Sequence, residues 1–493
     1  MDNRGLLRFY SFGRGGGIAL FLVAAQLYTS PSREFGVGSY QLTQNVPLLS
    51  TISCQYNHSD GPDKHVYYTL SDPTAKSITM DFALQIQPEI ISCTSSPRAY
   101  HNIVVFGGSM TGGGQCKEGI REKKECAWPA RFQRWLTASY GGCIQVHNFA
   151  RGGTQTEVAL SMIPVMLNNF AKSHGQPDLV ITDFSVNDVY ELDGNVGRQS
   201  VLRDDGGMFT VQEKGAAIAE LLILTVRNLT RDTSKIRHWI ILSHHPKVFE
   251  DSGLLNSFAR MARLHGVAVL DTRQLWPNYW FPVDTHPDFR THELLAELLV
   301  SGFCTALGMQ RPIRNILETA GLPQFSLETL RERLPSCTNP VTVHSAYEQY
   351  KHAPDDVGDW KLIEDRKGKP GWISTVTNSS LVLPLTFGAT PLLVVNYLRS
   401  YEGVGCANLS INGVDVILSG PWTKNISTTA TFYSQAYANT IQSSPGDDNY
   451  GIIGFGIQPY TQHNAIFTLT TCPEQETVPG KPNKFKLIEV VTC

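Results

Sequence analysis

A lone serine follows a short apolar run near residue 109, in a setting that could support nucleophilic chemistry. Val104, Val105 and Phe106 predict a buried strand, because no polar alternation interrupts them. Two glycines then allow a tight turn before Ser109. Open α/β sheets place their ligand crevices at the carboxyl ends of strands, where this serine would lie. Ser109 is therefore a candidate nucleophile.

Three other loops carry residues suited to the same chemistry. They contain Gly153, Asn187, and the closely spaced pair Asp284 and His286. The first two loops follow apolar runs that predict strands, and the third precedes a helix-like segment. The loops that follow the strands of a parallel sheet emerge at one edge. Residues far apart in the sequence are therefore expected to meet in one crevice.

Chemistry suggests a role for each of these residues. A serine hydroxyl is a weak nucleophile until a base takes its proton, and His286 is the natural base. Asp284 could orient the imidazole and stabilise its charged form. The amides of Ser109 and Gly153 and the side-chain amide of Asn187 would donate hydrogen bonds to the oxyanion of an acyl-transfer intermediate. The set predicts ester chemistry.

The framework for these loops is predicted by apolar runs that alternate with amphipathic segments from about residue 98 to 310. Strands are expected at 103–107, 143–148, 179–184, 239–243 and 267–270. Helices are expected at 130–138, 157–171, 216–229, 254–264 and 292–305. Such alternation favours a parallel sheet that is covered on both faces.

Four sequence blocks in this order resemble the SGNH, or GDSL-like, hydrolases. Ser109, Gly153, Asn187 and His286 stand at the positions of the four residues for which that family is named. The resemblance covers roughly residues 98–310. It implies a flavodoxin-like three-layer α/β/α sandwich and the hydrolysis of esters without a metal or cofactor.

The sequence departs from the family pattern at three positions. Gly108 replaces the usual aspartate before the serine, and Ser185 replaces a glycine in the third block. Val283 stands three residues before the histidine, where the family usually has an aspartate. Asp284 lies only two residues before His286, so it could act through a shifted turn. Alternatively, the serine and histidine could work as a dyad.

The whole chain divides into five regions. Residues 1–30 combine arginines with a short apolar run, which is typical of a signal peptide or a short signal anchor. An irregular or β-rich lead-in is expected at 31–97, the hydrolase-like domain at 98–310 and a linker at 311–345. From 346 to 493, strand-like runs broken by turn residues predict an all-β, sandwich-like accessory domain. Its aromatic residues are more typical of a sandwich core than of a sugar-stacking platform.

Composition limits the possible partners and the compartment. The net charge of -3 over 493 residues leaves no electrostatic footprint for nucleic acid. Ten cysteines without a Cys-x-x-Cys pair favour disulfides over zinc sites. Five sequons predict glycosylation, at Asn57, Asn228, Asn378, Asn408 and Asn425. The protein is expected to be secreted, or to lie in the Golgi or ER lumen as a type II anchored protein if its first segment is not cleaved.

Together these features predict a secreted or lumenal serine esterase. Its substrate would be an acylated small molecule or glycan, with acetyl as the expected acyl group. Two alternatives stay open. One is a lumenal O-acyltransferase that forms the same acyl-enzyme but excludes water from the second step. The other is a non-catalytic glycan-binding protein that retains the hydrolase scaffold.

Overall fold

The structure is a computed structural model. Its described residues are 72–86, 101–140, 142–193, 211–229, 237–243, 245, 253–283, 286–308, 337, 339–350, 356–366, 368–421, 427–435, 455–472 and 483–493. All of them belong to one compact unit, Ile52–Cys493. We call residues 72–308 the α/β part and residues 339–493 the β part.

A five-stranded parallel sheet forms the centre of the α/β part. Its strands, in spatial order, are β4 (Ile144–Asn148), β1 (His101–Gly107), β5 (Leu179–Asp183), β6 (Arg237–Leu242) and β7 (Ala268–Asp271). This order is that of flavodoxin-like folds. Nearly every residue of β1 and β5 is buried, since both faces of a parallel sheet are covered. The predicted parallel α/β class is confirmed.

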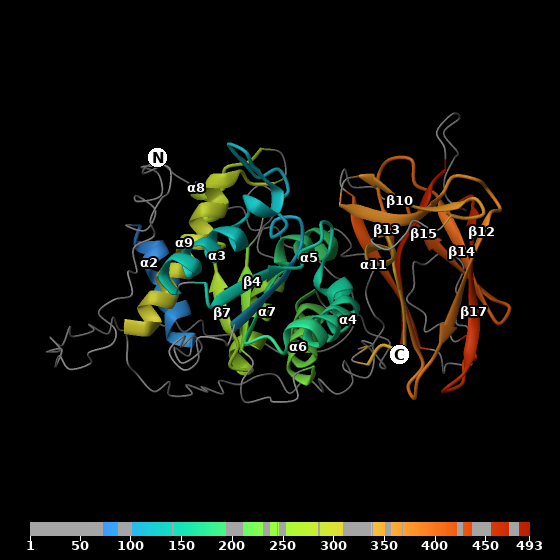
Figure 1. Cartoon of the computed structure of the whole chain (residues 1–493), viewed down its shortest axis with the longest axis horizontal. Coiled ribbons are helices and arrows are strands. Elements are labelled where there is room, and N and C mark those ends of the chain that lie inside the picture. The colour runs from blue at the N-terminus through green and yellow to red at the C-terminus, as the bar shows by residue number, and fades with distance from the viewer. Residues whose placement is uncertain are drawn as a thin grey trace, which may run out of the picture. The chain divides into compact units, whose positions relative to one another are not determined.

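Helices cover both faces of this sheet (Figure 1). One face shares a hydrophobic core with α2 (Pro73–Gln85), α3 (Trp128–Tyr140) and α9 (Phe289–Gly308). The other shares a core with α4 (Thr156–His174), α6 (Val211–Asn228) and α7 (Leu254–Leu264). Two shorter helices, α5 (Ser185–Asp193) and α8 (Trp276–Tyr279), follow β5 and β7.

Helix α2 lies where the sequence analysis expects an irregular or β-rich lead-in, and that expectation is wrong for Pro73–Gln85. Asp72 caps the helix, since its Oδ1 accepts a hydrogen bond from the Thr74 N–H at 2.7 Å. The fully buried Phe82 packs edge-to-face on Trp239 of β6, with ring centroids 5.2 Å apart. The buried positions recur at helical spacing, a signal that the many polar residues of this region obscure.

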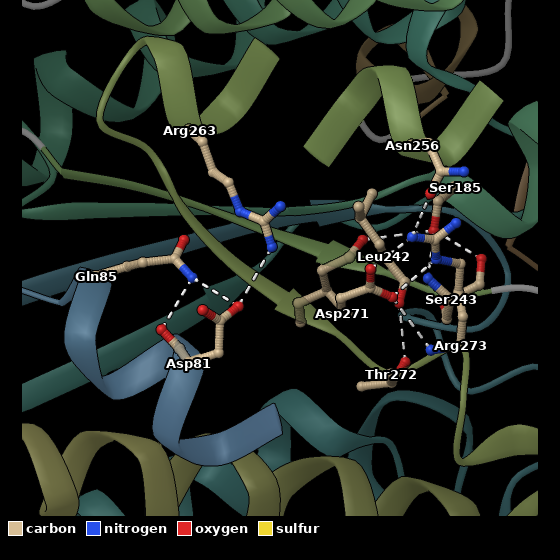
Figure 2. Close-up of polar contacts among 11 residues, drawn as sticks. Asp81, Gln85, Ser185, Leu242, Ser243, Asn256, Arg263, Asp271, Thr272 and Arg273 are labelled. Carbon is tan, nitrogen blue, oxygen red and sulfur yellow. Dashed lines mark hydrogen bonds and ion pairs between the residues drawn. The ribbon is translucent and has the colours of Figure 1, made fainter. Parts of the chain in front are cut away.

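Polar contacts fix α2 and the ends of the central strands (Figure 2). Arg263 of α7 pairs with Asp81 of α2 at 3.3 Å. The hydroxyl of Ser185 donates to the Ser243 carbonyl at 2.9 Å and accepts from the Ser243 N–H at 2.8 Å. Ser185, which replaces the glycine usual in the SGNH pattern, thus joins the ends of β5 and β6.

Two antiparallel sheets form the β part (Figure 1). The larger contains β8 (Thr342–Ser345), β9 (Asp356–Val357), β10 (Trp360–Arg366), β11 (Lys369–Ser374), β13 (Leu392–Arg399), β16 (Thr428–Gln435) and β18 (Phe485–Thr492). The smaller contains β12 (Ser380–Thr386), β14 (Cys406–Ile411), β15 (Val414–Ser419) and β17 (Gln462–Thr470). Trp360, Trp372 and Tyr397 are buried in the core that both sheets share. The all-β expectation is confirmed.

Disulfides among the described cysteines include Cys116–Cys126, Cys337–Cys493 and Cys406–Cys472, and Cys143 and Cys304 are disulfide-bonded as well. Such bonds indicate an oxidising, extracellular or lumenal compartment.

The expected signal segment 1–30 and most of the expected linker 311–345 lie outside the described residues. In the part of the chain that the structure describes, no helix is long and apolar enough to cross a bilayer.

The sequons differ in their accessibility. Asn228 and Asn378 are exposed, whereas Asn408 is half-buried within β14. Asn57 and Asn425 lie outside the described residues. Glycosylation therefore stays a prediction, and the structure leaves room for it at the first two positions.

The docking of α2 can be tested with two substitutions in the same helix. Phe82→Ala should lower the free energy of unfolding by about 3–5 kcal/mol, because it empties a fully buried site. Leu84→Ala is the control, since that side chain is 54% exposed, and it should cost roughly 0.5 kcal/mol or less. Urea denaturation followed by tryptophan fluorescence measures both. Equal losses would contradict the packing of α2 against the sheet.

Candidate active site

The hydroxyl of Ser109 and the ring of His286 meet at the carboxyl edge of the parallel sheet. Ser109 Oγ lies 2.8 Å from His286 Nε2, although the two residues are 177 positions apart in the sequence. Ser109 follows β1, and His286 precedes α9. Both are half-buried. The hydroxyl can therefore donate to the ring nitrogen and lose its proton to it.

The loop that carries His286 is a tight turn. The Val283 N–H donates to the His286 carbonyl at 2.9 Å, and Pro282 pairs with Pro287 across the turn. Val283 occupies the position of the family's aspartate, and its side chain is 58% exposed. Asp284 lies outside the described residues.

A glycine turn after the nucleophile contacts the imidazole. A Cβ atom at Gly114 would lie 2.7 Å from Cδ2 and 3.0 Å from Nε2 of His286. The Gly114 N–H donates to the Ser109 carbonyl at 2.7 Å, so this turn also holds the nucleophile. The sequence analysis assigns the turn no role, although its glycines follow the candidate serine directly. Because Gly114 has no side chain, the His286 ring can lie against its backbone.

Asn187 lies beside the turn that precedes Ser109. A Cβ atom at Gly108 would collide with Asn187 Nδ2, so any larger residue there would displace this amide. The amide donates to the Thr154 carbonyl at 2.6 Å. An amide nitrogen carries two hydrogens, and among the described residues the second has no acceptor. This second N–H of Asn187 can therefore donate a hydrogen bond to an oxyanion.

The loop that contains Gly153 runs beside the nucleophile. A Cβ atom at Gly152 would lie 3.6 Å from Ser109 Cβ, and Gly153 has a φ of +81°, which favours glycine. Within the described residues, neither the Ser109 N–H nor the Gly153 N–H has an acceptor. The Gly153 carbonyl is held from the other side, because it accepts from the Thr429 N–H at 3.1 Å.

Two buried carboxyl groups hold these loops from behind. Asp183 accepts hydrogen bonds from Thr111 Oγ1 at 2.7 Å and from Trp128 Nε1 at 3.1 Å, and burial raises its pKa to about 6. Asp188 accepts from both the N–H and the hydroxyl of Thr156 at 2.7 Å, and burial raises its pKa to about 7. Both carboxyl groups are thus bonded to residues that adjoin the candidate site.

A second histidine, His292, follows His286 closely in the chain and is buried. His292 is fully buried in α9, and burial lowers its pKa to about 3. It is therefore neutral at neutral pH and stays so well into the acid range. Among the described histidines, His286 is the one that contacts Ser109.

Side chains of the β part contact Arg151, in the loop that carries Gly153. The Arg151 guanidinium lies over the Tyr347 ring at 4.0 Å. It also pairs with Glu489 at 3.6 Å and with Glu348 at 3.9 Å. Sequence reasoning missed these contacts, because their partners lie about two hundred to about three hundred and forty residues further along the chain and no local pattern marks them. The β part thus helps to fix a loop of the candidate site.

Comparison with protein-family models and with curated proteins finds no match. Among solved structures, a two-domain esterase active on acetylated mannans, crystallised with mannopentaose, is 16% identical, with 85% of this chain and 94% of that chain covered and a TM-score of 0.48. The esterase EstA of Pseudoalteromonas sp. is 13% identical, with 42% and 99% covered and a TM-score of 0.32. A GDSL-like lipase candidate from Parabacteroides merdae is 14% identical, with 43% and 96% covered and a TM-score of 0.29.

These similarities concern the fold, and none of them extends to the roles of residues. The matches to EstA and to the GDSL-like protein span a little over two fifths of the chain, in its N-terminal part. The arrangement of Ser109, Gly153, Asn187 and His286 stands on the distances given above.

Two alanine substitutions in one turn test the contact between Gly114 and the imidazole. Gly114→Ala should lower the kcat for ester hydrolysis by about 10²-fold, because the added methyl group pushes His286 away from Ser109. Gly112→Ala is the matched control, since its Cβ would meet nothing closer than 3.4 Å, and it should keep most of the activity. Similar kcat values for the two variants would refute the contact.

Proposed function

We propose that this protein is a serine esterase that hydrolyses O-acyl esters, acetyl esters in particular. The observation that carries this proposal is the 2.8 Å distance between Ser109 Oγ and His286 Nε2. The loop arrangement supports it, because the same small region contains backbone and side-chain N–H groups without acceptors among the described residues.

The proposed reaction has two halves. Ser109 Oγ attacks the ester carbonyl while His286 takes its proton, and the imidazolium then protonates the departing alcohol. Water next enters, His286 takes a proton from it, and the resulting hydroxide attacks the acyl carbonyl. The bond to Ser109 Oγ then breaks, the acid leaves, and the imidazolium returns its proton to Ser109 Oγ. Each half of the reaction needs a group that first accepts a proton and then donates it. The imidazole of His286 can do both.

The tetrahedral intermediates need hydrogen-bond donors for their negative oxygen. We assign this role to the N–H groups of Ser109 and Gly153 and to the Asn187 side-chain amide. In other enzymes one such donor is worth about 2.7–4 kcal/mol of transition-state stabilisation. The tether between Asn187 and the Thr154 carbonyl would keep the amide in place before substrate arrives.

An O-acylated glycan is the substrate class we favour, with an acylated small molecule as the other candidate. The disulfides support an extracellular or lumenal protein. Secretion itself, the cleavage of the first segment and the glycosylation sites remain part of the proposal.

The proposed function is tested with 4-nitrophenyl acetate, purified protein and two variants. The wild-type protein should release nitrophenol, and Ser109→Ala and His286→Ala should each lower kcat by at least about 10³-fold with an unchanged melting temperature. A folded wild-type protein without turnover on any acetyl ester would favour the glycan-binding alternative. Transfer of the acetyl group to an added sugar in preference to water would favour the acyltransferase.

The third member of the proposed triad has its own test. Asp284→Asn should lower kcat by about 10²–10⁴-fold if the carboxylate orients His286, because the amide supports the wrong imidazole tautomer. The measurement is the pH profile of kcat/KM for both proteins. Full activity of the variant would show that Ser109 and His286 act as a dyad.

A further inference from the structure

A lysine of the β part lies beside the loop of Gly152 and Gly153, close to the side of that loop which Ser109 borders. A Cβ atom at Gly152 would lie 3.1 Å from Lys369 Cε and 3.2 Å from Lys369 Nζ, and the same point is 3.6 Å from Ser109 Cβ. The absent side chain of Gly152 therefore leaves a small space that the Lys369 ammonium and the Ser109 side chain both border.

The backbone of Lys369 is held at the start of a strand. Lys369 is the first residue of β11 and pairs with Arg366 across the hairpin formed with β10. Its carbonyl accepts a hydrogen bond from Lys486 Nζ at 2.6 Å, and Lys486 is in turn paired with Asp365 at 2.5 Å. The hairpin is thus anchored to β18, and the half-buried lysine is directed by a rigid element.

Positive charge is in excess around this ammonium. Asp365, an acid of the same hairpin, is already engaged by Lys484 and Lys486. Within the described residues, no carboxylate lies within ion-pair distance of Lys369 Nζ. Burial lowers the pKa of Lys369, and the charges of Arg366 and Lys486 lower it further.

A half-buried ammonium without an acid partner is costly unless a ligand supplies the negative charge. We propose that Lys369 is a specificity-determining residue that binds an anionic oxygen group of the substrate, and that the protein therefore acts on O-acylated acidic sugars. This inference rests on the esterase function proposed above. An acetyl group carries no charge, so the anion belongs to the sugar that bears the ester. It is a uronic acid carboxylate or a sulfate ester, which present the same oxygen chemistry to an ammonium.

The test compares three acetylated methyl glycosides that differ in one group. The neutral glucoside is the reference, the glucuronoside adds a carboxylate, and the glucoside 6-sulfate adds a sulfate. The wild-type protein should hydrolyse at least one anionic sugar with a kcat/KM about tenfold or more above the reference, mainly through a lower KM. The anionic sugar with the higher kcat/KM shows whether the protein prefers a carboxylate or a sulfate.

Three variants connect that preference to the lysine. Lys369→Met should bring the ratio of anionic to neutral kcat/KM close to one, and Lys369→Glu should bring it below one. Lys369→Arg should keep a ratio well above one, because it retains the charge. Lys361→Met, which removes an exposed lysine of β10, is the control and should leave the ratio unchanged.

The two possible failures are distinguishable. A wild-type protein that hydrolyses 4-nitrophenyl acetate but shows equal kcat/KM for all three sugars overturns the role of Lys369 and leaves the esterase intact. A preference that survives in Lys369→Glu also overturns it. A protein that hydrolyses none of the esters, 4-nitrophenyl acetate included, overturns the esterase proposal and this inference with it.

Discussion

The parallel pairing of β1 with β4 and β5 is the constraint on which the candidate site depends. Because all three strands run the same way, the loops after them leave at one edge of the sheet. The segments after these strands carry Ser109, Gly153 and, in the first turn of α5, Asn187, and the turn before α9 brings His286 to the same edge. Buried carboxyl groups behind the loops then fix them with hydrogen bonds. The topology of the sheet therefore determines which residues lie together at this edge.

The β part contributes to this arrangement through one loop. Residues 151–154 follow β4. They are held on one side by Asn187 and on the other by Thr429 and by the acidic partners of Arg151. A loop that supplies oxyanion donors must not move, since hydrogen-bond geometry decides their worth. The β part therefore stabilises one loop of the candidate site. Its buried aromatic residues pack in its own core.

Much of the α/β part could be predicted because β1 and β5 are apolar runs and amphipathic segments alternate with the strands. The expectation that Ser109 and His286 meet comes from this alternation together with residue chemistry and the order of the four sequence blocks. Helix α2 could not be predicted, because its apolar positions are spread among polar residues and its partner Trp239 is far along the chain. Lys369 was missed for the same reason: side chains that meet through tertiary packing leave no local pattern.

The most direct measurement of the central claim is the site of covalent modification by a fluorophosphonate. Such reagents are attacked by an activated serine hydroxyl, so the claim predicts one adduct per chain, mapped to Ser109 by peptide mass spectrometry. The adduct should be lost when His286 is replaced by alanine. An unmodified Ser109 in the folded protein, or an adduct elsewhere, would contradict the pairing of serine and histidine on which the whole account rests.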